Sequence, residues 1–217
     1  PTAVAGLDDA VSVSSGDDYS CALRKTGQVL CWGNNNDRQM LTGAFTRSRP
    51  HLLPELPELQ TLVTGDGSVC GLTADETIHC GSSMAYQTLQ EALGHDGRLL
   101  RPVTALALGD DHICVADDQG NVWCGGGNDA GQLGLGNYFA CDNPHGDVLD
   151  CAIVHPGGRR TPVDENARQR GRVPIAQVRR LSSGGVETCA VTAQGAVLCW
   201  GGLNQLRPRR VVGVRSA

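Results

Sequence analysis

Runs of alternating apolar and polar residues recur along the chain, and a short polar turn joins each run to a second one. The pattern is clearest in four segments: 21–31, 70–80, 114–124 and 189–199. Alternation with a period of two is typical of β-strands, and two runs around a turn predict a β-hairpin. Gly27, Gly120 and Gly195 stand where a three-residue hairpin loop needs a left-handed residue. Glu76 takes that place in the second hairpin, so we expect strain or a different turn there.

Cysteines bound each of these hairpins. The chain has ten cysteines, which form five neighbouring pairs with a spacing of ten residues: Cys21 and Cys31, Cys70 and Cys80, Cys114 and Cys124, Cys141 and Cys151, Cys189 and Cys199. A three-residue loop places the two cysteines of a hairpin directly opposite each other, at a Cα separation of about 4.5–5.5 Å, which a disulfide accepts. Zinc knuckles of the Cys-x-x-Cys type are absent from the sequence. The spacing therefore predicts cross-strand disulfides and an oxidising compartment.

The hairpins are parts of a longer repeat. A glycine precedes the first cysteine of each hairpin by five residues (Gly16, Gly65, Gly109 and Gly184), and an apolar-patterned strand precedes each glycine. A loop rich in Gly and Asn follows most of the hairpins. Successive units are 49, 44 and 75 residues apart, and repeats of this length with three or four strands are typical of propeller blades. We expect an all-β, propeller-like array of four blades in one domain, residues 1–217, forming a closed ring or an arc of a larger propeller.

Several motifs of the units resemble the repeats of the regulator of chromosome condensation family. They are the glycine before the hairpin, Trp-Gly at 32–33 and 200–201, the run 131–134 (Gly-Gln-Leu-Gly), and a Pro-x-x-Val-x-Gly pattern at 1–7 and 208–214, interpreted as a leading strand. The resemblance implies a β-propeller, typically of seven blades. The family includes a nuclear exchange factor for a small GTPase and secreted propellers, among them a β-lactamase inhibitor. The cysteine pairs depart from the nuclear members and resemble the extracellular ones.

Composition and charge exclude several classes of protein. No apolar stretch is long enough to span a membrane, and the opening PTAVAGLDDA lacks the features of a signal peptide, so we expect a removed leader or a longer chain. The sequence pI of 5.6 argues against nucleic-acid binding. Residues 1–150 carry 20 acidic and 7 basic groups, whereas residues 151–217 carry 3 and 11. This asymmetry indicates either a binding surface or two parts that neutralise each other in the fold.

The turns between the leading strands and the hairpins are the first candidate site. Equivalent loops of a propeller gather on one face around its axis, so we expect a ring of polar side chains there: Asp17, Asp18, Tyr19, Asp66, Asp110, Asp111, His112 and Glu187. A ring of carboxylates is suited to a cationic partner or a metal ion. The alternative is that aspartate simply suits a turn.

The second candidate is an inserted, disulfide-stapled loop, residues 137–172. Its Cys141–Cys151 segment holds four oxygen-bearing side chains suited to calcium, although their spacing matches no EF-hand: Asp142, Asn143, Asp147 and Asp150. Five arginines are suited to an acidic partner or a glycan: Arg159, Arg160, Arg168, Arg170 and Arg172. The alternative is a mobile, solvated loop. Trp32, Trp123 and Trp200 are expected to pack between blades rather than to stack on ligands.

No catalytic signature accompanies these features: the sequence lacks H-E-x-x-H, G-x-S-x-G and a phosphate-binding Gly-Lys-Ser/Thr motif. We therefore expect a non-enzymatic scaffold without a cofactor. It would be secreted, periplasmic or on a cell surface, and would bind another protein or an assembly through a propeller face and the insertion. The alternatives are a carbohydrate-binding lectin or adhesin propeller and a hydrolase that uses the aspartate ring.

Overall fold

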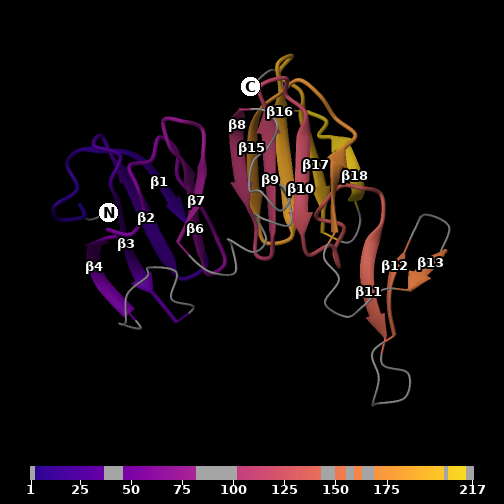
Figure 1. Ribbon diagram of the computed structural model, residues 1–217, viewed down its shortest axis with the longest axis horizontal. Helices are drawn as coiled ribbons and strands as arrows, with labels where there is room; N and C mark the ends of the chain where they lie inside the picture. The colour runs from indigo at the N-terminus through magenta and orange to yellow at the C-terminus, as the bar shows by residue number, and fades with distance from the viewer. Residues whose placement is uncertain are drawn as a thin grey trace.

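The computed structural model describes most of the chain as β-structure. The described residues are 3–36, 46–81, 102–142, 150–154, 159–162, 169–202 and 205–213. Their strands form five antiparallel sheets (Figure 1). These ranges contain no helix, and so none that could cross a membrane.

Four of the sheets are blades, each built from the strands of one repeat. The first blade contains β1 (Ala10–Ser15), β2 (Tyr19–Arg24), β3 (Val29–Asn34) and β4 (Thr46–Leu52). The second contains β5 (Val63–Gly65), β6 (Ser68–Leu72) and β7 (Ile78–Cys80). The third contains β8 (Val103–Leu108), β9 (His112–Asp117), β10 (Val122–Gly126) and β14 (Gln169–Val173). The fourth contains β15 (Val178–Gly184), β16 (Glu187–Thr192), β17 (Val197–Gly201) and β18 (Gln205–Arg210).

The fifth sheet belongs to the insertion and consists of β11 (Tyr138–Asp142), β12 (Asp150–Val154) and β13 (Arg160–Pro162). Figure 1 shows this small sheet standing apart from the blades. The last residues of the segment assigned to the insertion, 169–172, belong to β14, which pairs with β10 as the outer strand of the third blade.

The four hairpins share one turn geometry, as the sequence predicts. In the first hairpin the amide of Gly27 donates to the Arg24 carbonyl at 2.9 Å, and the Arg24 amide donates to the Gln28 carbonyl at 2.9 Å. The same two bonds recur in the other three hairpins. Gly27, Gly120 and Gly195 have φ values of 84°, 73° and 73°, and Glu76 adopts φ 63° in the same turn. The strain expected at Glu76 is therefore confirmed, because a side-chain-bearing residue occupies the left-handed region.

The turn places the paired cysteines opposite each other. Cys21 pairs with Cys31 in the β2–β3 register, and equivalent pairings hold in the other hairpins. Four disulfides join these pairs, with Cα separations of 4.1–4.2 Å. Cys141 and Cys151 are also opposite each other, in β11 and β12, but their side chains lie outside the described residues. The predicted cross-strand disulfides are confirmed for all four blade hairpins.

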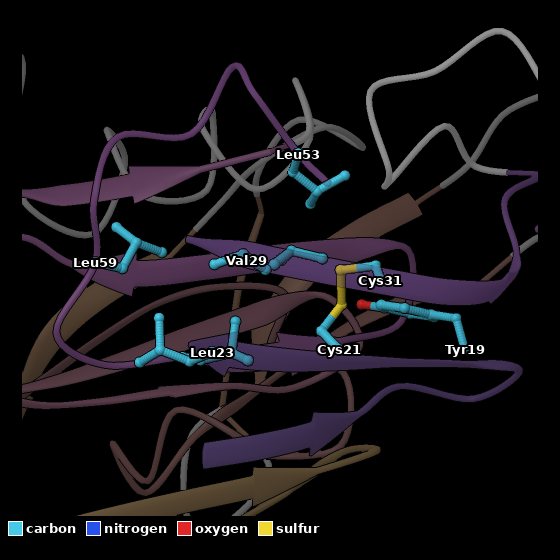
Figure 2. Close-up of a cluster of buried hydrophobic side chains, with 9 residues drawn as sticks. Tyr19, Cys21, Leu23, Val29, Cys31, Leu53 and Leu59 are labelled. Carbon is cyan, nitrogen blue, oxygen red and sulfur yellow. A yellow bond between two sulfur atoms is a disulfide. The ribbon is translucent and has the colours of Figure 1, made fainter. Parts of the chain in front are cut away.

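Each blade has two faces with different roles. The front face, defined here as the one that carries the disulfide, packs against the back face of the next blade. Between the first and second blades, Tyr19, Cys21, Leu23, Val29 and Cys31 meet side chains from the connecting segment and the second blade: Leu53, Leu56, Leu59, Leu62 and Val69. Figure 2 shows the disulfide among these side chains. Two further clusters fill the next two interfaces, so the core lies between the blades.

The blades follow one another as an open arc. Their innermost strands contact in sequence order, β1 with β5, β5 with β8 and β8 with β15, and Figure 1 places the first and fourth blades at opposite ends. Of the two architectures expected, ring and arc, the described sheets form the arc.

The role assigned to the Pro-x-x-Val-x-Gly pattern as a leading strand is wrong. Its second copy begins inside β18, the outer strand of the fourth blade, and residues 211–213 then form a turn. Its first copy precedes β1, and residues 3–9 contain no strand. The glycine of each copy has a positive φ, 79° at Gly6 and 90° at Gly213, and the second copy marks the end of an outer strand rather than the start of a leading one.

Candidate functional site

The turns that end the leading strands lie against one another along one face of the arc. A Cβ atom at Gly16 would lie 2.6 Å from the carbonyl oxygen of Gly65, and one at Gly65 would lie 2.2 Å from that of Gly109. A Cβ at Gly109 would lie 2.7 Å from the Gly185 carbonyl oxygen, which also accepts a 3.0 Å hydrogen bond from the Asp110 amide. Glycine is needed here because each backbone passes so close to the next. The four turns thus form one continuous surface.

Three of these turns bring carboxylates together. Partial burial raises the pKa of Asp110, and the like charges of Asp17, Asp66 and Asp111 raise it further. These like charges come from the first three blades, whose adjoining turns therefore form an acidic axial surface, defined here by Asp17, Asp66, Asp110 and Asp111. The fourth turn has Gly185 and Val186 in the equivalent places, and its Glu187 is exposed.

Two residues of the predicted ring are buried between blades instead. Tyr19 is 4% exposed, and its hydroxyl donates to the carbonyl oxygens of Gly65 and Ser68 at 2.8 and 2.6 Å. His112 holds the same place in the third blade and is 1% exposed; its Nε2 lies 2.7 Å from the Thr188 hydroxyl oxygen. Both side chains join their blade to the next, so they underlie the acidic surface without lining it.

Burial governs the protonation of His112. It lowers the pKa of the imidazole to about 4, although the charges of Asp111 and Asp129 act in the opposite direction. Nδ1 lies 3.9 Å from an Asp111 oxygen and has no hydrogen-bond partner among the described residues. The side chain is therefore neutral near pH 7, and we assign it no acid–base chemistry.

Gln132 extends the acidic surface, a role that sequence reasoning missed. This glutamine is fully buried, and its Nε2 donates to Asp111 Oδ1 at 3.0 Å and to Asp129 Oδ1 at 2.8 Å. Its Oε1 accepts from the Ala130 amide at 2.8 Å. One buried amide thus holds two exposed carboxylates beside the turn surface. The Gly131–Gly134 motif marked this loop, but no local pattern pointed to its contact with Asp111, 21 residues away.

The predicted residues of the insertion are only partly described. Arg159, Arg160 and Arg172 are exposed, and Arg172 donates to the Asn121 side chain. Asp142 and Asp150 lie opposite each other in β11 and β12. Asn143, Asp147 and Arg168 lie outside the described residues, as does the side chain of Arg170. In the described part of the chain, no group of three or more His, Cys, Asp or Glu side chains is placed to hold a metal ion.

A pocket of about 450 Å³ lies between the third and fourth blades, at the hairpin-turn end opposite the acidic surface. Thr104, Asp117, Gln177, Arg179 and Gln194 are among the residues that line it. The Asp117 carboxylate accepts bonds from the amides of Gln119 and Asn121, so it stabilises the hairpin turn. The pocket is mainly polar and contains no nucleophile–base pair.

These features define a β-propeller-type repeat protein that has an acidic axial surface. A sequence model of the regulator of chromosome condensation (RCC1) repeat matches residues 10–39 and 103–132, which contain the first and third hairpins. These two segments therefore match the RCC1 repeat, as the resemblance indicated.

Curated relatives are similar over part of their length. Regulator of chromosome condensation from Drosophila melanogaster is 25% identical over 142 residues, which are 60% of this chain and 26% of the fly protein. X-linked retinitis pigmentosa GTPase regulator from Mus musculus is 27% identical over 150 residues, which are 64% of this chain and 13% of the mouse protein. The chain thus spans about a quarter or less of these relatives.

Solved structures confirm the fold. Prp20p from Saccharomyces cerevisiae superimposes with a TM-score of 0.65 at 17% identity, over 97% of this chain and 52% of that one. Human WBSCR16 gives a TM-score of 0.56 at 19% identity, over 95% and 67% of the two chains. Identities this low support the shared architecture alone.

Proposed function

We propose that the chain is a protein-binding module whose acidic axial surface holds a basic segment of its partner. The observation that carries this proposal is the grouping of Asp17, Asp66 and Asp110 on adjoining turns: partial burial raises the pKa of Asp110, and the like charges of Asp17 and Asp66 add to the effect. Carboxylates held together against their own repulsion favour a cationic ligand, which relieves that repulsion on binding. The fold has a precedent for protein binding, since the work on Prp20p describes its binding to Gsp1p and histones.

The acidic surface is built on a rigid base, which suits a recognition site. Tyr19 and His112 fix the turns from below, and Gln132 orients Asp111 and Asp129. Rigid placement lowers the entropic cost of binding. The exposed arginines of the insertion, Arg159 and Arg160, provide a region of opposite charge, and we assign it a second contact with the partner's acidic groups.

The disulfides support a location in an oxidising compartment. Four described cross-strand bonds in one chain of 217 residues are typical of secreted, periplasmic or cell-surface proteins. We propose that the module acts there as a non-catalytic scaffold. The curated relatives are named as regulators, which agrees with a role in binding.

A defined basic probe tests the acidic surface. A fluorescent lysine-rich peptide should bind the oxidised chain at low ionic strength and dissociate as salt is added, because exposed charges are screened. The triple variant Asp17→Asn, Asp66→Asn, Asp110→Asn should lose roughly tenfold or more in affinity.

The matched control removes three negative charges elsewhere: Asp8→Asn, Glu55→Gln, Glu58→Gln. This variant should keep most of the affinity, because its net charge changes equally but the axial surface is intact. Equal losses in the two variants would show that only the net charge matters and would refute the assigned site.

A further inference from the structure

The polar pocket between the third and fourth blades has no part in the protein contact proposed above, because it lies at the opposite end of the blades. Its volume of about 450 Å³ is within the range of small-molecule sites. Three segments and one strand residue line it: the hairpin turn of the third blade, residues 117–120, the start of β15 with the residue before it, 177–179, the hairpin turn of the fourth blade, 193–194, and Thr104 of β8. The pocket thus belongs to the interface between two complete hairpins.

Backbone hydrogen bonds hold the walls of this pocket in place. The Val178 amide donates to the Gly120 carbonyl at 3.1 Å, and the Ala193 amide donates to the Gln177 carbonyl at 2.7 Å. A Cβ atom at Gly120 would lie 2.7 Å from the Gln177 Cα atom, so glycine permits this close approach. Both hairpin turns are therefore tied to the segment that begins β15, and the pocket is already formed in the absence of a ligand.

Gln177 has a strained backbone at this pocket. Its φ is 59°, and Glu76 is the only other non-glycine residue with a positive φ in the described part of the chain. Strain of this kind is concentrated at functional sites. The Gln177 side chain is exposed, so core packing does not account for a glutamine here. Its Oε1 accepts a hydrogen bond from Gln194 Nε2, which links the two sides of the pocket.

The lining side chains indicate the class of ligand. Three of them are amides: Gln119, Gln177 and Gln194. An amide both donates and accepts hydrogen bonds, and so does a hydroxyl group of a ligand. Asp118 and Arg179 add one charge of each sign, so a ligand with a net charge would face one like charge whichever sign it carried. We propose that this pocket binds a neutral saccharide unit, whose several hydroxyls match the amides and both charged groups.

Titration of the oxidised, ¹⁵N-labelled chain with simple saccharides, followed by NMR, tests the proposal. The probes are the methyl glycosides of glucose, galactose and mannose, and N-acetylglucosamine. At least one should shift the side-chain amide signals of Gln177 and Gln194 saturably, with a Kd of about 1 mM, because no aromatic ring lines the pocket among the described residues. Glycine, a zwitterion, serves as the charged comparison and should leave these signals unchanged. Saturable shifts with glycine and none with a saccharide would overturn the proposal.

Gln177→Gly separates loss of binding from loss of folding. The variant removes the amide but relieves the left-handed conformation, so it should fold at least as well as the parent chain. We expect saccharide affinity to fall roughly tenfold, because the ligand loses its hydrogen bonds to this side chain. The matched control is Glu76→Gly, which makes the same backbone change at φ 63° in the second blade and should leave the affinity unchanged.

Gln194→Ala, a second variant on the opposite side of the pocket, should also weaken saccharide binding. Unchanged affinity in both pocket variants, or an equal loss in Glu76→Gly, would refute the assigned site. All three variants should still bind the lysine-rich peptide as the parent does, since its site is at the other end of the blades. Failure of the saccharide test and failure of the acidic-surface test are therefore distinguishable.

Discussion

The interface between the first and second blades and the one between the third and fourth use the same backbone frame with different chemistry. In the first, the Tyr19 hydroxyl bonds to two carbonyl oxygens, and leucines of the connecting segment fill the space beside the disulfide. In the second, His112 bonds to Thr188, and Trp200 packs into the core and donates to the Gln132 carbonyl at 2.9 Å. The repeat thus specifies where blades meet, while individual side chains determine how each interface responds to mutation and pH.

Replacing the tryptophans should have the largest effect on stability and should distinguish the two regions most clearly. Trp200→Ala removes a side chain that is 1% exposed and should cost about 3–5 kcal/mol of unfolding free energy. Trp32→Ala changes the equivalent residue of the first blade, which is only half-buried, and should cost roughly 1 kcal/mol. Urea unfolding of the oxidised chain gives both values. Equal losses would show that the interface around Trp200 is no more important than the open face of the first blade.

The second-largest effect is expected on acidification, which should destabilise the interface that contains His112 and not the one that contains Tyr19. The pKa of His112 is about 4 in the folded chain, below its ordinary value of 6.5, so the unfolded chain takes up the proton first. The stability contributed by neutral His112 is therefore fully present above about pH 6.5 and is lost as the pH falls towards 4, by at most a few kcal/mol. Asp110 acts in the opposite direction, because its raised pKa makes protonation favour the folded state.

His112→Tyr isolates the contribution of the histidine. It transfers the Tyr19 arrangement of the first interface to the second, with Gly109 providing the close approach that Gly16 provides for Tyr19. The difference in unfolding free energy between the variant and the parent should change with pH between 6.5 and 4 and be constant above that range. A difference that does not vary with pH would contradict the buried, neutral state of His112.

The smallest effect is expected at the hairpin turn of the second blade. Glu76→Gly relieves a left-handed conformation at φ 63° and should stabilise the chain by about 1 kcal/mol. Gly195→Ala in the fourth blade places a side chain in the same conformation and should lose a similar amount. Calorimetry should detect shifts of about 2–4 °C for changes of this size. If Glu76→Gly is neutral or destabilising, contacts of the Glu76 side chain outweigh the backbone strain.

Local patterns in the sequence were sufficient to predict the hairpins. The spacing of Cys21 and Cys31 and the place of Gly27 fix both the register and the turn, because these are interactions between near neighbours. The outer strands were harder to predict. β4 and β14 each follow a long connection, and Pro208 lies within β18, where a proline is tolerated because the strand is at an edge of the sheet.

The candidate site was predictable only in part. The carboxylates of Asp17, Asp66 and Asp110 meet because equivalent turns of a repeat meet, which the sequence implied. The burial of Tyr19 and His112 depends on the next blade, 46 to 76 residues away along the chain. Among the tryptophans, Trp200 packs between blades as predicted, whereas Trp123 is 36% exposed. Contacts this distant leave no local signal in a single sequence.

The path of the chain around the small sheet β11–β13 has a consequence for how such a protein can diversify. The chain leaves the third blade after β10, forms an independent sheet, and returns in β14 to pair with β10 without a break in register from Val122↔Val173 to Gly126↔Gln169. Doubling the length of a flexible connection costs only about 0.6 kcal/mol. The inserted segment between β10 and β14 can therefore be exchanged for another, in evolution or by design, while the third blade keeps the hydrogen bonds between β10 and β14.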